Sequence, residues 1–230
     1  PNVIEIRLCF IEELRIDAQT FFEHASEIVE LLPALCSLNL RKARKSLDEL
    51  VHLPELQHVR FLDLRMADLG DAGIQKLLQS PHLRDIVELN LHGNSLSTKG
   101  VQALSVSDSL RNLRSLNLGA NRLTVPACKA LSMSPVLKDL QSLSLWSTGL
   151  NDKALARLAA TDRLAGLTRL DVGSNRLSST GIQTLANGPW NLPSLDPGYN
   201  ENFGVEAARF PANGLSMSEL RPPPALRHGR

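Results

Sequence analysis

The sequence predicts an α/β solenoid shaped like a horseshoe, with parallel strands on its concave face and helices on its convex face. Around each of a series of regularly spaced leucines, apolar and polar residues alternate, which indicates a short strand. Further along each repeat, apolar residues lie three and four positions apart, which indicates a helix. The leucines recur at spacings of 24, 24, 27, 27, 27, 27 and 25 residues: Leu14, Leu38, Leu62, Leu89, Leu116, Leu143, Leu170 and Leu195.

Each repeat follows the pattern L-x-x-L-x-L-x-x-N-x-L and then continues into its helix. Prolines in the stretches SPHL (80–83) and SPVL (134–137) end the helices, because proline cannot continue the hydrogen-bond ladder. Strands pack about 4.8 Å apart, whereas helices pack about 10 Å apart. A stack of such repeats must therefore curve, with the strands on the inner side.

Four asparagines lie where the chain turns off a strand: Asn94, Asn121, Asn175 and Asn200. A buried amide at that point can bond backbone groups that the turn leaves unpaired. We therefore interpret these asparagines as a structural ladder. Ala43, Ala67 and Thr148 occupy the same position in other repeats, so we expect weaker turns there.

The pattern divides the chain into three parts. Residues 1–10 form a leader or edge segment, residues 11–210 form about eight repeats, and residues 211–230 form a disordered, proline-rich tail. A longer helix is expected over 17–32, capped by Asp17, and it covers the N-terminal end of the core. The last repeat is degraded, so we expect a weakly capped C-terminal end and self-association through it.

The stretches FIEELRIDAQTFFEHASEI and GDAGIQKLLQSPHLRDIVELNLHGNSL carry a family resemblance. Between residue 11 and about residue 210 the chain resembles leucine-rich repeat proteins of the ribonuclease-inhibitor-like class, and in particular long bacterial arrays of the planctomycete and myxobacterial type. The resemblance implies helices on the convex face and binding of a protein partner. It does not specify which partner, because the family binds proteins through many different surfaces.

Composition and charge exclude several classes of function. The net charge of +1 gives no reason to expect a nucleic acid partner. No apolar run approaches the length that a membrane span needs, so no membrane association is expected. The three cysteines, Cys9, Cys36 and Cys128, form no CxxC pair, which indicates a reducing, cytoplasmic location.

The sequence also lacks the signatures of common enzymes. It contains no GxxxxGK[ST], GxSxG or HExxH motif, so we expect neither catalysis nor a cofactor. Asp63, Asp171 and Asp196 belong to different strands and cannot converge on one metal ion. Cys128 occupies a repeat position that holds Ile, Val or Leu in the neighbouring repeats, so we expect it in the core.

The candidate binding residues lie on the concave face. The position just after the last leucine of the motif's strand, or its equivalent, reads Asp17, Arg41, Arg65, His92, Gly119, Trp146, Gly173 and Gly198. Trp146 stands between two glycines, which predicts that both faces of its indole are uncovered and that it is a binding hot spot. The alternative is that the indole lies flat over a neighbouring strand. His92, in the same row, is a further candidate.

A second candidate group is Arg41, Lys42, Phe61 and Arg65, on two adjacent strands near the N-terminal end. We expect these residues to cluster and to hold an acidic segment of a partner. The alternative is a solvated basic face without a ligand.

The function that follows is a non-catalytic scaffold for protein–protein interaction, which binds its partner on the concave face. Two alternatives stay open. One is a regulator of the GTPase-activating, leucine-rich repeat kind, using Arg41 or Arg65. The other is the recognition arm of a bacterial effector or ubiquitin ligase whose catalytic domain lies outside this chain.

Overall fold

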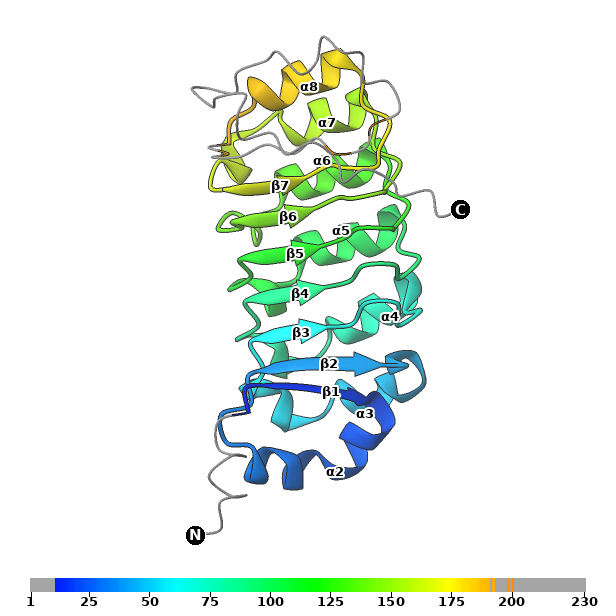
Figure 1. Cartoon of the computed structure of the whole chain (residues 1–230), viewed down its shortest axis with the longest axis vertical. Helices are drawn as coiled ribbons and strands as arrows, with labels where there is room; N and C mark the ends of the chain where they lie inside the picture. The colour runs from blue at the N-terminus through cyan, green and yellow to red at the C-terminus, as the bar shows by residue number, and fades with distance from the viewer. Residues whose placement is uncertain (1–10, 191, 193–197, 199, 201–230) are drawn as a thin grey trace, which may run out of the picture.

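The computed structural model describes residues 11–190, 192, 198 and 200. Within them, strands pair in parallel in one open sheet that follows the order of the sequence (Figure 1). The strands are β1 (Glu13–Asp17), β2 (Ser37–Arg41), β3 (Phe61–Asp63), β4 (Glu88–Asn90), β5 (Ser115–Asn117), β6 (Ser142–Ser144) and β7 (Arg169–Asp171).

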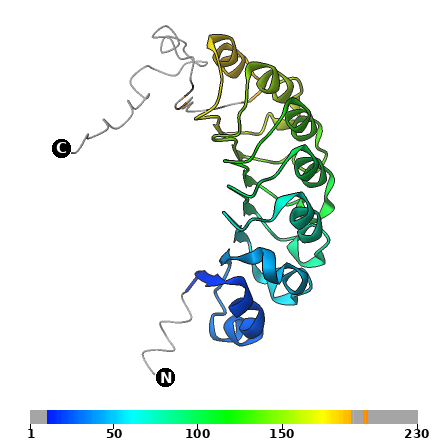
Figure 2. The ribbon, with the colours of Figure 1, turned by 90° about the vertical axis from the view of Figure 1, so that its right-hand side faces the viewer.

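Helices follow the strands and cover the outer side of the curve. They are α2 (Ala18–Leu31), α3 (Leu47–Leu50), α4 (Gly70–Leu77), α5 (Thr98–Val106), α6 (Val125–Met133), α7 (Asp152–Leu158) and α8 (Ser179–Ala186). Short 3-10 helices lie before several strands: η2 (Pro54–His58), η3 (Pro81–Leu83), η4 (Asp108–Leu110) and η5 (Asp162–Leu164); η1 (Ala43–Ser46) follows β2. Figure 2 shows the strands inside and the helices outside, so the predicted solenoid is confirmed.

The strand register confirms the leucine alignment. Leu14 pairs with Leu38, and each repeat leucine then pairs with the next as far as Leu170. The seventh of these residues, Leu170, ends the described series, since Leu195 lies outside the described residues. The repeat leucines from Leu38 to Leu170 are buried, with at most 4 % of their surface exposed. Stacking of the repeats thus builds one continuous aliphatic core.

The first helix matches the expectation for residues 17–32 and differs at its start. Phe21 and Ala25 are buried, and α2 ends before Pro33. Asp17 stands at the cap position, yet its side chain makes no capping hydrogen bond. The carboxylate instead pairs with cations of the next repeat, so the predicted cap is wrong.

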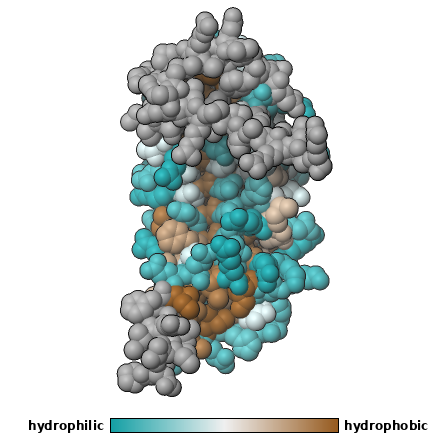
Figure 3. All heavy atoms as spheres, viewed as in Figure 1, coloured by the Kyte–Doolittle hydropathy of each residue, from teal (hydrophilic) through white to brown (hydrophobic). Residues whose placement is uncertain are grey.

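Figure 3 shows hydrophobic surface at the N-terminal end of the face that carries the strands, and mainly polar residues further along. Leu14, Ile16 and Ile28 are only partly buried at that end. The predicted leader (1–10) and proline-rich tail (211–230) lie outside the described residues, as does most of the last repeat. The weakly capped C-terminal end therefore stays a prediction.

Candidate binding surface on the concave face

The same turn geometry recurs from repeat to repeat because buried asparagines bond the backbone of the turn. Asn121 is 1 % exposed, and its Oδ1 accepts hydrogen bonds from the backbone N–H of Asn94 (3.0 Å) and Leu96 (2.9 Å). Its Nδ2 donates to the carbonyls of Leu91 (3.0 Å) and Leu118 (2.9 Å). One side chain therefore ties together two consecutive repeats, which is a structural role and leaves the amide inaccessible to a ligand.

The other members of the ladder work in the same way. The Nδ2 atoms of Asn94, Asn175 and Asn200 donate to the carbonyls of Leu64, Leu145 and Val172, each in the preceding repeat. At the position where Thr148 replaces asparagine, its hydroxyl donates to the Leu145 carbonyl at 2.9 Å. The threonine thus supplies part of what the amide supplies elsewhere.

A polar row on the strands also serves the backbone. The Oδ1 atoms of Asp63, Asn90, Asn117 and Asp171 each accept from the backbone N–H two residues later, at distances between 2.9 and 3.1 Å. These bonds shape the turn after each strand. The row is therefore only partly available to a ligand.

The cations that the sequence singled out are held by neighbouring carboxylates. Arg41 and Lys42 both pair with Asp17, at 3.0 and 2.7 Å, and the Lys42 hydrogen bond is the main cause that lowers the pKa of Asp17. Arg65 donates from Nε to Asp63 at 2.7 Å, and this hydrogen bond is the main cause that raises the pKa of Arg65. Arg65 thus has a carboxylate of its own, whereas Arg41 and Lys42 share the single negative charge of Asp17.

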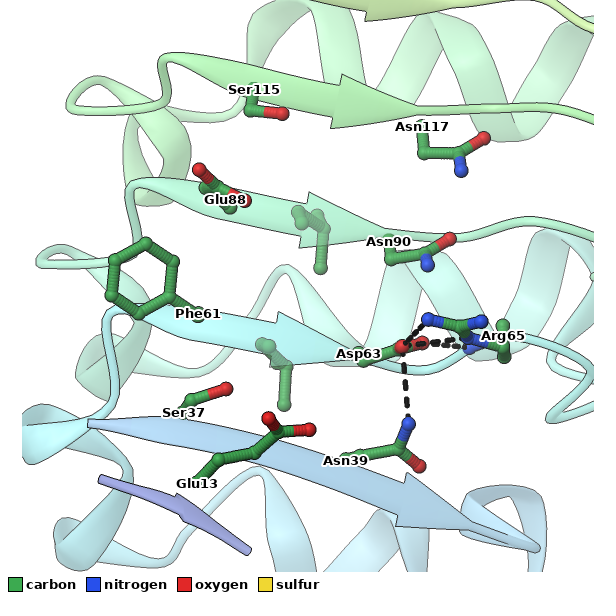
Figure 4. A pocket seen from close by; sticks show the side chains of 12 residues that line it. Glu13, Ser37, Asn39, Phe61, Asp63, Arg65, Glu88, Asn90, Ser115 and Asn117 are labelled. Carbon is green, nitrogen blue, oxygen red and sulfur yellow. Dashed lines mark hydrogen bonds and ion pairs between the residues drawn. The ribbon is translucent and has the colours of Figure 1, made fainter. Parts of the chain in front are cut away.

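Phe61 does not join these cations. It begins β3, whereas Arg65 follows the other end of the same strand (Figure 4). The expectation that Arg41, Lys42, Phe61 and Arg65 form one cluster is therefore not met, because one strand length separates the ring from the charges. The sequence itself separates them, since Phe61 precedes Arg65 by four residues and a strand rises about 3.3 Å per residue.

Trp146 lies on the concave side of the turn after β6 and is 40 % exposed. The imidazole of His92 stacks on its indole, with ring centroids 5.9 Å apart and planes inclined by 28°. On the other side, a Cβ atom added to Gly173 would lie 3.1 Å from Trp146 Cδ1. The prediction that both faces of the indole are uncovered is wrong, although a large part of the side chain stays exposed.

Gly119 makes the stack possible. It occupies the same row on the strand between His92 and Trp146, and an added Cβ would lie 2.8 Å from His92 Nδ1 and 3.2 Å from the Trp146 carbonyl oxygen. A side chain there would displace the imidazole of His92 from its present position. His92, Gly119 and Trp146 together form what we call the aromatic pair site.

A hollow of about 280 Å³ opens on the concave face nearer the N-terminal end (Figure 4). It lies over β1 to β5, and Phe61 and Glu88 stand on adjacent strands at one side of it. We call it the Phe61 hollow. Its other lining residues are Glu13, Ser37, Asn39, Leu62, Asp63, Arg65, Leu89, Asn90, Ser115 and Asn117.

Sequence reasoning missed a second link between repeats, at the start of the helices. Asp71 Oδ1 accepts from the backbone N–H of Ser97 (2.8 Å) and Gly100 (3.0 Å), and Oδ2 accepts from the Ser97 hydroxyl (2.5 Å). Asp152 and Ser178 repeat the arrangement. The signal was present, since an aspartate in one repeat precedes a serine at the next helix start in both cases.

One cysteine, Cys128, is shielded from solvent, and the described acidic groups are not clustered as metal ligands would be. Cys128 is fully buried, and burial raises the pKa of its thiol to about 12. Within residues 11–190, 192, 198 and 200 no group of His, Cys, Asp and Glu is placed to hold a metal ion. None of the described helices has the length and apolar character of a membrane span.

The repeats are recognised by sequence comparison as well. The family model for the leucine-rich repeat matches four stretches, 55–78, 81–105, 109–132 and 167–186. These stretches lie in the same parallel solenoid as the unmatched repeats between them. These four stretches of the chain are thus leucine-rich repeats. No curated protein sequence is significantly similar to the chain.

Solved structures with similar folds include a leucine-rich repeat protein of Leptospira interrogans, which is 19 % identical over 90 % of this chain and 60 % of that one, with a TM-score of 0.43. The yeast complex of Rad7 and Elc1 is 16 % identical over 80 % of this chain and 63 % of that one, with a TM-score of 0.39. A complex of TLR13 with ssRNA13 is 18 % identical over 79 % and 22 %, with a TM-score of 0.36. This chain spans less than two thirds of each.

Proposed function

We propose that the chain is a non-catalytic scaffold that binds a protein partner on its concave face, with the aromatic pair site as the anchor. The observation that carries the proposal is the exposure of Trp146, 40 %, in a row where its neighbours are glycines and a stacked histidine. An indole held by a stack loses little side-chain freedom on binding, and tryptophan is enriched among interface residues that dominate affinity.

The surroundings support this anchor. The backbone groups near it are satisfied by the asparagine ladder, so the turn that carries Trp146 is fixed by the Asn175 bonds to the N–H groups of Thr148 (3.0 Å) and Leu150 (2.9 Å). A rigid apolar side chain on a mainly polar face provides a specific contact at small entropic cost. We propose a cytoplasmic location for the interaction, since Cys36 and Cys128 are both free thiols.

The alternative of a GTPase-activating regulator gains no support from a specific contact. Arg41 and Arg65, the cations that it would use, are paired with Asp17 and Asp63. The alternative of a recognition arm for a separate catalytic domain uses the same concave surface, so it shares the anchor proposed here.

The test is affinity capture from lysate with the wild-type chain, Trp146→Ala and a matched control, followed by identification of the captured protein. Met133→Ala is the control, because Met133 is 55 % exposed on the convex helix α6. We expect the wild type and the control to capture the same partner, and Trp146→Ala to lose it. If Trp146→Ala retains the partner as well as the control does, the anchor is wrong.

A further inference from the structure

The Phe61 hollow carries one carboxylate without a counter-charge. Glu88 is exposed, and its side chain makes no ion pair or hydrogen bond with any residue that the structure describes. It stands beside Phe61, its direct partner in the register of β3 and β4. Figure 4 shows the Phe61 ring at the edge of the hollow with Glu88 on the next strand.

The other charges that line the hollow are already balanced. Asp63 is paired with Arg65 and also accepts a hydrogen bond from Asn39 Nδ2 at 3.1 Å. Glu13 is paired with Arg15 at 2.9 Å. The remaining side chains of the lining are neutral. After this internal pairing, the hollow keeps one excess negative charge, at Glu88.

The size of the hollow limits its occupant. Pockets that enclose a complete drug-sized molecule range from about 300 to 1,000 Å³. The hollow, at about 280 Å³, falls just below that range and is open to solvent on the concave side. Its dimensions therefore suit one long side chain of a partner better than a whole small molecule.

We propose that the Phe61 hollow receives an arginine side chain of the protein partner. The guanidinium group would lie against the Phe61 ring and pair with the Glu88 carboxylate, since arginine stacks on aromatic faces and binds carboxylates through its planar fork. The inference rests on the proposed function and adds the chemistry of the partner. It differs from the sequence-based expectation of an acidic segment, because the hollow is lined by the unpaired carboxylate of Glu88 and not by Arg41 or Lys42.

The experiment uses two small probes and the isotope-labelled full chain. N-acetyl-arginine N-methylamide is titrated in parallel with its citrulline analogue, which keeps the planar end group and lacks the charge. Amide resonances of the protein are followed by NMR. We expect the arginine probe to shift the resonances of Phe61, Glu88 and Ser115, and the citrulline probe to shift them at least about threefold less at equal concentration.

Three variants locate the site. Glu88→Gln removes the charge, and Phe61→Leu keeps an apolar side chain while removing the aromatic ring. Each should weaken binding of the arginine probe about two- to fivefold, as expected for one exposed ion pair or one cation–π contact. Glu49→Gln is the matched control, because Glu49 is an exposed carboxylate on α3 and lies outside the hollow. It should bind the probe as the wild type does.

Equal shifts from both probes overturn the inference, and so do arginine-induced shifts that persist unchanged in Glu88→Gln and Phe61→Leu. Absence of any shift at the hollow overturns it as well. These results are distinct from a failure of the proposed function, because that failure concerns capture by Trp146→Ala. A partner can be lost with Trp146→Ala while the arginine probe shows no preference, in which case the scaffold function stands and the arginine site falls.

Discussion

The imidazole of His92 stacks on the indole of Trp146 across Gly119, although the two residues belong to repeats that are not adjacent. The glycine between them carries no side chain, so the rings meet over the middle strand. Each ring restricts the other, which fixes the direction in which the exposed edge of the indole points. The aromatic pair site therefore depends on three consecutive repeats being stacked in the correct register.

This geometry predicts two classes of tryptophan fluorescence. Trp146 is 40 % exposed, whereas Trp190 is 6 % exposed and donates from Nε1 to the Leu185 carbonyl at 2.9 Å. Acrylamide should therefore quench the emission of Trp146 strongly and that of Trp190 weakly.

Two variants test this assignment. Trp146→Phe should remove the strongly quenched part of the emission. His92→Ala should increase the quenching of that part further, because it uncovers one face of the indole. Equal quenching of both tryptophans in the wild type would contradict the structure.

Loss of one rung of the asparagine ladder should be costly. Asn121→Ala leaves the buried N–H groups of Asn94 and Leu96 without their acceptor. Each unsatisfied buried group costs about 1–3 kcal/mol, so we expect a loss of about 3 kcal/mol or more in the free energy of unfolding. Urea unfolding followed by circular dichroism measures it.

Asn39→Ala is the control for that variant. Asn39 is partly buried on the open concave face and donates one hydrogen bond, to Asp63. Its replacement should cost less than about 1 kcal/mol. If both variants lost a similar free energy of unfolding, a ladder asparagine would stabilise the fold no more than an asparagine on the surface does.

The repeats, the register and the ladder positions could be predicted because the sequence spacing determines them. A leucine that recurs every 27 residues must meet its equivalent in the next repeat, as Leu89 and Leu116 do. The same argument placed Asn94 and Asn121 where the chain leaves the strand. Residues at equivalent positions of successive repeats are buried in the same way, whatever their individual contacts are. The periodicity of the sequence was therefore sufficient to predict which leucines and asparagines are buried.

The candidate site could be predicted only in part, because it depends on pairs of side chains. The row that contains His92, Gly119 and Trp146 was visible in the sequence, but the stack arises from how far two rings reach across a glycine. Likewise, the Asp17 carboxylate can either cap the helix that follows it or pair with Arg41 on the neighbouring strand. The sequence alone does not decide between these two contacts. The structure has the ion pair, because the neighbouring strand brings the cation within 3.0 Å.

The link between Asp71 and Ser97 predicts a pH dependence of stability. Burial alone would raise the pKa of Asp71, but the hydrogen bonds from Ser97 and Gly100, with Lys99 nearby, outweigh it and lower the pKa. A carboxyl group whose pKa is lower in the folded state stabilises the fold above its unfolded pKa of about 3.9, and this contribution is lost as the pH falls through the folded value.

We therefore expect Asp71→Asn to be less stable than the wild type at pH 7, by about 2 kcal/mol. The difference should shrink as the pH is lowered below about 4. Urea unfolding at a series of pH values measures it. Asp108→Asn serves as the control, because Asp108 is exposed at the start of η4 and its side chain makes no hydrogen bond or ion pair with a described residue. A difference for Asp71→Asn that is constant from pH 7 to pH 3 would show that the charge of the carboxylate is not involved.

The Cys128 thiol should be inert in the folded chain. It is fully buried in the column that Ile74, Val101, Leu155 and Ile182 occupy in other repeats, and its pKa is raised to about 12 by burial. Only the thiolate reacts with alkylating agents. At pH 8 the thiolate fraction is then about a thousandfold smaller than that of an ordinary cysteine, whose pKa is about 8.5.

Alkylation with iodoacetamide, followed by peptide mass mapping, tests this directly. Cys36 is only partly buried and should be modified in the native state, whereas Cys128 should be modified only as the chain unfolds in urea. The same packing argument predicts that Cys128→Val is tolerated within about 1.5 kcal/mol, because valine is apolar and similar in size. Cys128→Ser should cost more, since a hydroxyl would be buried among aliphatic side chains without a dedicated partner. Rapid native modification of Cys128 would show that the helices open locally at this repeat.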